Sequence, residues 1–149
     1  MERRAFVKSG CKLCITGMVM MMLSPAEVWA GKKNKLFKTQ LNEQGQAEIP
    51  MALFEETNVQ IVRVKELEYD IVLHKEQDEN YTALLMKCTH FDNALYITGE
   101  GMRCSLHGSE FDTQGNVLKG PAELPLLKYE TQKTATNILI QIGKQNNHE

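Results

Sequence analysis

Alternating apolar and polar positions dominate this chain from about residue 36 onward. β-Branched residues recur with a period near two over residues 59–64 and 69–73, which is typical of strands with one buried face. Looser alternation predicts further strands over residues 36–41, 47–53, 81–86, 94–98, 101–104, 126–131 and 137–142. Helical spacing occurs only around residues 51–57, so the pattern predicts an all-β fold.

Turn-like segments separate these predicted strands. Asn42-Glu43-Gln44-Gly45 and Thr113-Gln114-Gly115-Asn116 have the composition of turns. Gly99-Glu100 is short enough to close a hairpin between the strands at 94–98 and 101–104. The chain is therefore expected to fold back on itself at this point.

The composition fits one globular domain. The 149 residues are 42% hydrophobic, which is ordinary for a chain with a real core. Charged residues make up 24% and the formal net charge is -2, so the chain lacks the basic field that nucleic-acid binding requires. No nucleic acid is expected among its partners.

The first thirty residues have the composition of an export signal. Arg3 and Arg4 begin a basic head, a modest apolar run follows over residues 13–23, and Val28-Trp29-Ala30 offers the small residues that a signal peptidase needs. The arginine pair resembles a twin-arginine signal. On this interpretation residues 1–30 are a signal peptide, and residues 31–149 are a single mature domain in the periplasm.

An uncleaved membrane anchor facing the periplasm is the alternative for this segment. A spanning helix needs about twenty apolar residues, whereas the run here is shorter and is bounded by Lys12 and Pro25. Membrane contact is therefore expected only through an uncleaved signal. Cys11 and Cys14 form a C-x-x-C ahead of the apolar run and are expected to leave with the signal.

Two short Cys–His pairs are the chemical signal of the mature chain. Cys88-Thr89-His90 follows a predicted strand, and Cys104-Ser105-Leu106-His107 follows the hairpin, so folding brings two sulfurs and two imidazoles to a common centre. Without residues 1–30, Cys88 and Cys104 are the remaining thiols, and a disulfide between them is one interpretation. The histidine at a matched offset after each cysteine favours metal binding instead.

This ligand set suits either zinc or an iron–sulfur centre. Zinc fingers place paired cysteines in one half and paired histidines in the other, whereas here each half contributes one of each. That distribution is what a two-iron cluster requires when two cysteines bind one iron and two histidines bind the other. A small zinc-binding structural domain is kept as an alternative.

At these motifs the chain resembles the Rieske iron–sulfur family. Residues 104–112, CSLHGSEFD, are similar to the second cluster-binding loop of the family, with Gly108, Ser109 and Asp112 matching. Gly120-Pro121-Ala122 resembles its glycine-proline loop, which shields the cluster from a third side. The resemblance implies a Rieske-like antiparallel β framework with a smaller cluster-binding subdomain inserted at about residues 87–125.

The resemblance also implies one [2Fe-2S] cluster per subunit. By this likeness Cys88 and Cys104 bind the inner iron, and His90 and His107 bind the outer iron, nearer solvent. Neutral imidazoles in place of two thiolates make an electron easier to accept, which raises the potential to roughly −150 to +300 mV. The expected chemistry is the transfer of one electron at a time.

Departures from the family pattern refine this expectation. In quinol-oxidising members a disulfide joins the two loops, but here the corresponding positions hold Asn93 and Leu106. Those members also carry a serine and a tyrosine whose hydroxyls hydrogen-bond toward sulfur, and this chain keeps Ser109 but has Phe111. We therefore expect a reduction potential below that of quinol-oxidising members.

The function expected from these features is that of a periplasmic electron carrier. Its partner is expected to be a redox protein, such as a c-type cytochrome or a subunit of a larger oxidoreductase. The alternative is that the chain is itself the Rieske subunit of a larger oxidoreductase, either a quinol–cytochrome c reductase or a complex of the arsenite-oxidase type.

Overall fold

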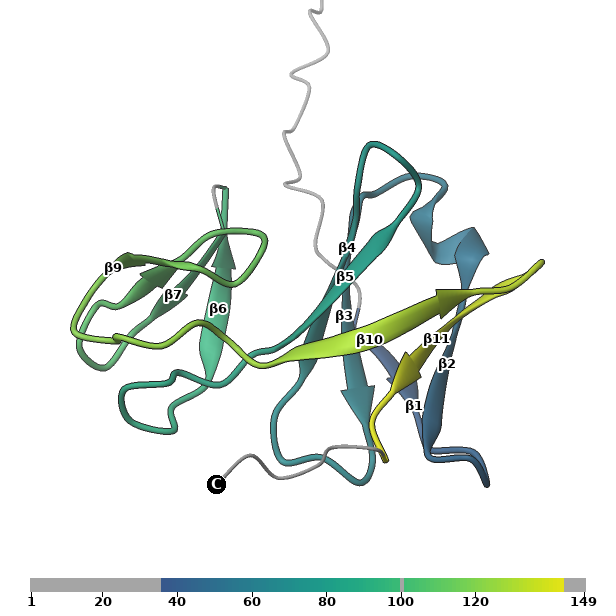
Figure 1. Cartoon of the computed structure of the whole chain (residues 1–149), viewed down its shortest axis with the longest axis horizontal. Helices are drawn as coiled ribbons and strands as arrows, with labels where there is room; N and C mark the ends of the chain where they lie inside the picture. The colour runs from purple at the N-terminus through teal and green to yellow at the C-terminus, as the bar shows by residue number, and fades with distance from the viewer. Residues whose placement is uncertain (1–35, 100, 144–149) are drawn as a thin grey trace, which may run out of the picture. The chain divides into compact units, whose positions relative to one another are not determined.

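The computed structural model describes residues 36–99 and 101–143, which belong to one unit of the chain, residues 33–149. Within them the chain forms eleven strands and one short 3-10 helix (Figure 1). In chain order they are β1 (Leu36–Thr39), β2 (Gln46–Pro50), η1 (Met51–Phe54), β3 (Val59–Val64), β4 (Ile71–Lys75), β5 (Tyr81–Leu85), β6 (Leu95–Thr98), β7 (Gly101–Cys104), β8 (Glu110–Phe111), β9 (Val117–Lys119), β10 (Lys128–Lys133) and β11 (Asn137–Gln141). The expected signal peptide, residues 1–30, lies outside the described residues.

The strands form two sheets. The larger has seven strands in the order β1-β3-β4-β5-β10-β11-β2, and the smaller has four in the order β6-β7-β8-β9. Figure 1 shows β6, β7 and β9 grouped apart from β3, β4 and β5. Paired strands are antiparallel except β1 and β3, which run parallel. The prediction of an all-β fold is confirmed, with one parallel pair added.

Strands β4 and β5 are buried along most of their length because a hydrophobic core lies on each face of the larger sheet. Leu73 and Ala83, which are paired across the two strands, belong to the first core. Val72 and Leu84 belong to the second core, which also contains Phe111 of the smaller sheet. Since successive side chains in a strand point to opposite faces, the central strands serve both cores. The second core joins the two sheets.

Two glycines allow the close approach of backbone that this arrangement needs. At Gly101, φ is +149° and a Cβ atom would lie 2.0 Å from the carbonyl oxygen of Phe111. At Gly115, φ is +87° and a Cβ atom would lie 2.9 Å from Cδ2 of Leu84. A side chain at Gly101 would separate β7 from β8. A side chain at Gly115 would separate the turn before β9 from β5.

Several strand boundaries differ from the predicted ones, among them those of β4, β2 and β10. Strand β4 starts at Ile71, two residues later than expected, and Asp70 just before it forms a bidentate ion pair with Arg63, with both N–O distances 2.7 Å. Strand β2 ends at Pro50, which lacks an N–H group for further pairing, and η1 follows. Strand β10 begins two residues later than expected, at Lys128.

His74 on β4 is a polar side chain within this apolar framework. Only 6% of it is exposed, and among the described residues its Nε2 atom is buried without a hydrogen-bond partner. Desolvation by burial lowers the pKa of His74, and the charge of Glu76 opposes this shift only in part. The folded chain therefore favours neutral His74.

We expect this histidine to make stability depend on pH. Because its pKa is lower in the folded chain, only the unfolded chain takes up a proton as pH falls below roughly 6.5, so the free energy of unfolding decreases. His74→Leu should reduce the loss of stability between pH 8 and pH 5.5, as measured by chemical denaturation of the complete protein. The other histidines are common to both proteins, and an equal loss in both would show that His74 is not responsible.

Candidate metal centre

The first Cys–His pair lies in a loop between β5 and β6. The loop is closed by a hydrogen bond of 2.8 Å from the Cys88 N–H to the Asn93 carbonyl oxygen. Asp92 has φ of 25°, which asparagine and aspartate tolerate better than most residues. Two side chains hold it: Tyr69 donates its hydroxyl to the Asp92 carbonyl, and Lys87, at the start of the loop, forms a 3.0 Å ion pair with the Asp92 carboxylate.

The second pair lies in the turn between β7 and β8. Cys104 is the last residue of β7, and its N–H donates to the Ser109 carbonyl at 2.9 Å. The Gly108 N–H donates back to the Cys104 carbonyl at 3.1 Å, and φ at Gly108 is +79°. This tight turn places His107 on the surface three residues after a buried cysteine.

The pairing of β6 with β7 brings the two loops together. Their register sets Leu95 opposite Cys104, so the loop before β6 meets the turn after β7. The rings of His90 and His107 have centroids 5.0 Å apart and an interplanar angle of 80°. Both histidines are exposed, whereas Cys88 and Cys104 are 1% and 2% exposed. The structure thus gathers the four candidate ligands, with sulfur inside and nitrogen outside.

The surroundings of Cys104 favour its thiolate. Burial by itself raises the pKa of the thiol, but hydrogen bonds from the backbone of Leu106, the side chain of Asn93, the backbone of His107 and the Cys88 thiol outweigh this effect and lower the pKa below its ordinary value. Both cysteines are free thiols, and the thiolate is the form that binds metal.

The chemistry of the donor set fits a two-iron cluster. Within the described part of the chain, no group of three or more His, Cys, Asp or Glu side chains is arranged to hold one metal ion. Each iron of a [2Fe-2S] cluster needs only two protein ligands, because sulfide supplies the rest. Two buried sulfurs and two exposed imidazoles match that division.

A third loop, residues 120–125, is fastened to both ligand loops by hydroxyl groups. The Thr89 hydroxyl donates to the Leu124 carbonyl at 2.7 Å, which ties this loop to the first pair. The Ala122 N–H donates to the Ser109 hydroxyl oxygen at 3.0 Å, which ties it to the second. Ser109 is fully buried, so this hydrogen bond is shielded from water.

The remaining predicted residue, Phe111, lies on β8 and is fully buried in the same core as Cys88 and Cys104. Two residues at the site, Thr89 and Asn93, were not expected from the sequence to join loops. Both carry side chains able to bridge loops, but their partners are far away in sequence or depend on the hairpin register.

Comparison with known proteins identifies the architecture. The sequence model of the Rieske [2Fe-2S] domain matches residues 49–130, more than half of the chain. The chain belongs to the Rieske [2Fe-2S] domain family. Its cofactor is a [2Fe-2S] cluster, and electron transfer is the chemistry of this Rieske domain. The expected family, fold class and cofactor are confirmed.

Solved structures and curated proteins resemble parts of this Rieske chain. The cyanobacterial plasma membrane Rieske protein PetC3 from Synechocystis PCC 6803 is 26% identical, with a TM-score of 0.53 over 61% of this chain and 93% of that one. A chain from the complex of reduced oxygenase and oxidized ferredoxin in carbazole 1,9a-dioxygenase, 16% identical, shares the fold with a TM-score of 0.53 over 70% of this chain and 99% of that one.

One curated relative is an oxygenase subunit. The tert-butanol monooxygenase / tert-amyl alcohol desaturase oxygenase subunit of Aquincola tertiaricarbonis is 32% identical over 79 residues. Those residues are 51% of this chain but 17% of that protein, so the likeness is confined to a small part of the oxygenase subunit.

In the described parts of the Rieske chain, no helix combines the length and apolar character needed to cross a membrane.

Removal of the Ser109 hydroxyl should weaken the attachment of the third loop. Ser109→Ala leaves the N–H group of the buried Ala122 without its acceptor, which typically costs about 1–3 kcal/mol. We expect a lower melting temperature for the cluster-loaded protein, measured by calorimetry. Thr113→Ala, at an exposed turn position, is the control and should change little. Equal melting of Ser109→Ala and wild type would show that this hydrogen bond is dispensable.

Proposed function

We propose that the chain is a periplasmic one-electron carrier whose cluster is bound by Cys88, Cys104, His90 and His107. The cluster-binding subdomain comprises about residues 87–125 of a mature domain formed by residues 31–149. The observation that carries this proposal is the division of the four side chains into two buried thiols and two exposed imidazoles, whose rings lie 5.0 Å apart.

In this proposal the burial of each ligand sets its role. The bound cluster supplies the capacity to take up and release a single electron. Cys88 and Cys104 lie in an apolar core that keeps water from the sulfurs. His90 and His107 face solvent, so they offer a partner the shortest approach to the centre.

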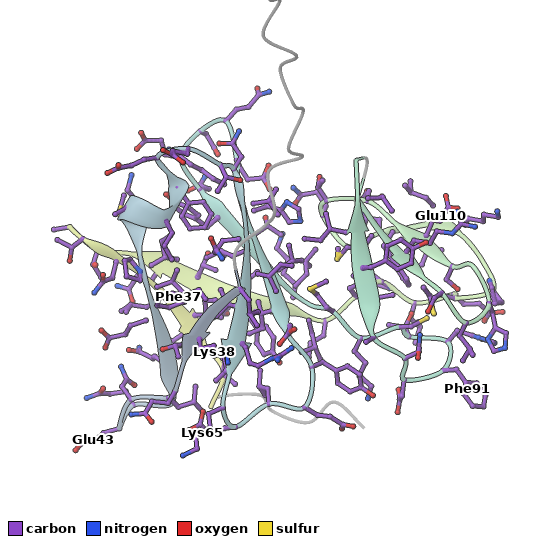
Figure 2. The ribbon with its side chains drawn as sticks, turned by 180° about the vertical axis from the view of Figure 1, so that it is seen from behind. Phe37, Lys38, Glu43, Lys65, Phe91 and Glu110 are labelled. Atoms are coloured by element: carbon purple, nitrogen blue, oxygen red, sulfur yellow. The ribbon has the colours of Figure 1, made fainter. Side chains whose placement is uncertain are left out.

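Phe91 marks the face through which a partner would approach. Its ring centroid lies 5.8 Å from that of His90 and 6.1 Å from that of His107, and 68% of the residue is exposed. Figure 2 shows the Phe91 side chain pointing outward from the ribbon. An exposed aromatic ring beside two imidazoles suits an apolar contact with a redox protein such as a c-type cytochrome.

The ligand assignment is tested by His90→Cys. A thiolate in place of a neutral imidazole adds negative charge to the oxidised centre, so iron should be retained and the reduction potential should fall. Voltammetry and electron paramagnetic resonance of the reduced protein measure both effects. His74→Gln is the control and should leave both unchanged. A His90→Cys protein with the wild-type potential and spectrum would show that His90 is not a ligand.

The alternative is a Rieske subunit of a larger oxidoreductase. It is favoured by the curated relative, which is an oxygenase subunit, and by the neighbour solved in a complex of oxygenase and ferredoxin. Both alternatives use the same four ligands and differ in whether the chain stays bound to a catalytic subunit.

Fractionation of cells that produce the full chain distinguishes these two functions. We expect an iron-loaded protein that begins after Ala30, is recovered from the periplasm, and elutes without a larger subunit in size-exclusion chromatography. Replacing Arg3 and Arg4 together by lysine keeps the charge but removes the twin-arginine pair, so this variant should remain in the cytoplasm. Co-elution with a large catalytic subunit would support the oxidoreductase instead, and periplasmic recovery of the lysine variant would contradict the export route.

A further inference from the structure

Asn93 contacts both ligand loops at once. Its backbone carbonyl accepts the Cys88 N–H at 2.8 Å, within the first loop. Its side-chain Nδ2 atom lies 3.6 Å from Cys104 Sγ and 3.5 Å from Ser105 Oγ, in the second loop. The same amide lies 3.2 Å from the Ala94 carbonyl oxygen. A single residue thus connects the backbone beside one cysteine with the sulfur of the other.

The contact with sulfur is a hydrogen bond of defined direction. A carboxamide NH2 group is only a donor, and the sulfur of a metal-bound cysteine is only an acceptor. Part of the charge gained on reduction resides on the sulfur ligands, so a donor aimed at one of them stabilises the reduced centre more than the oxidised one. Such a donor raises the reduction potential.

The position of Asn93 gives it a second effect. The carboxamide of Asn93, in the first loop, reaches Cys104 and Ser105 in the second and so joins the two loops. Asn93 is intermediate in exposure, so the hydrogen bond to Cys104 is partly shielded from water. A group that orients a metal ligand typically changes metal affinity by about 10-fold to 100-fold when it is removed.

We propose that Asn93 is a positioning residue that raises the reduction potential through its hydrogen bond to Cys104 and holds the two ligand loops together. The proposal rests on the ligand set of the proposed function. Asn93 is then a determinant of the reduction potential in this chain. Its effect depends on neither a loop disulfide nor a tyrosine hydroxyl, both of which the sequence lacks.

Three variants at this position test the proposal in the cluster-loaded protein. Asn93→Leu removes the donor and keeps the branching of the side chain, although leucine is larger. Asn93→Asp keeps the shape but replaces the donor by a carboxylate, and Asn93→Gln keeps a carboxamide. The expected order of reduction potential is wild type highest, Gln next, Leu lower and Asp lowest. Iron should be lost about 10-fold faster from the Leu variant than from wild type on incubation with a chelator.

The readouts separate this inference from the proposed function. Voltammetry gives the potential, electron paramagnetic resonance shows whether the ligand set is intact, and iron release gives the lifetime of the cluster. An intact spectrum with the wild-type potential in both the Leu and the Asp variants would overturn the role of Asn93 and leave the ligand assignment standing. If the Leu variant does not retain iron, the comparison of Asp with Gln decides, and equal potentials in these two overturn the proposal.

Discussion

The pairing of β6 with β7 is the constraint on which the rest of the site depends. Its register places Leu95 opposite Cys104, so the loop before β6 meets the turn after β7. A slip of one residue would turn Cys104 away from the core and toward solvent, because successive side chains in a strand point to opposite faces. Gly101 keeps β7 close to β8 on the other side, since a side chain there would collide with the carbonyl oxygen of Phe111.

The two cysteines of the site are also part of the hydrophobic core. Cys88 and Cys104 belong to the apolar core that also contains Val72 and Leu84 of the larger sheet. Packing that joins the two sheets therefore also keeps water from the sulfurs, and loosening that core would expose them. The histidines escape this burial because each follows its cysteine by two or three residues, at the point where the chain has left the core for a surface turn.

Much of the architecture could be predicted from the sequence. Alternation located most of the strands, and the spacing within 88–90 and 104–107 indicated the Cys–His pairs, because both signals are local. The parallel pairing of β1 with β3, the burial of His74 and the bridging role of Asn93 were not predictable. Each depends on which distant segment becomes a neighbour, and an alternating pattern fixes the face of a strand but not its partner.

The three bridges between the loops explain how this site is held without a covalent link. Thr89 and Ser109 fasten the third loop to the first and the second, and Asn93 joins the first to the second, so the hydrogen bonds close a triangle around the ligands. A disulfide constrains its loops but offers no donor to sulfur, whereas a carboxamide can do both, so in the role proposed for Asn93 the joining of the loops and the tuning of the potential are coupled. A frame of this kind forms without an oxidant, so it does not depend on an oxidising compartment.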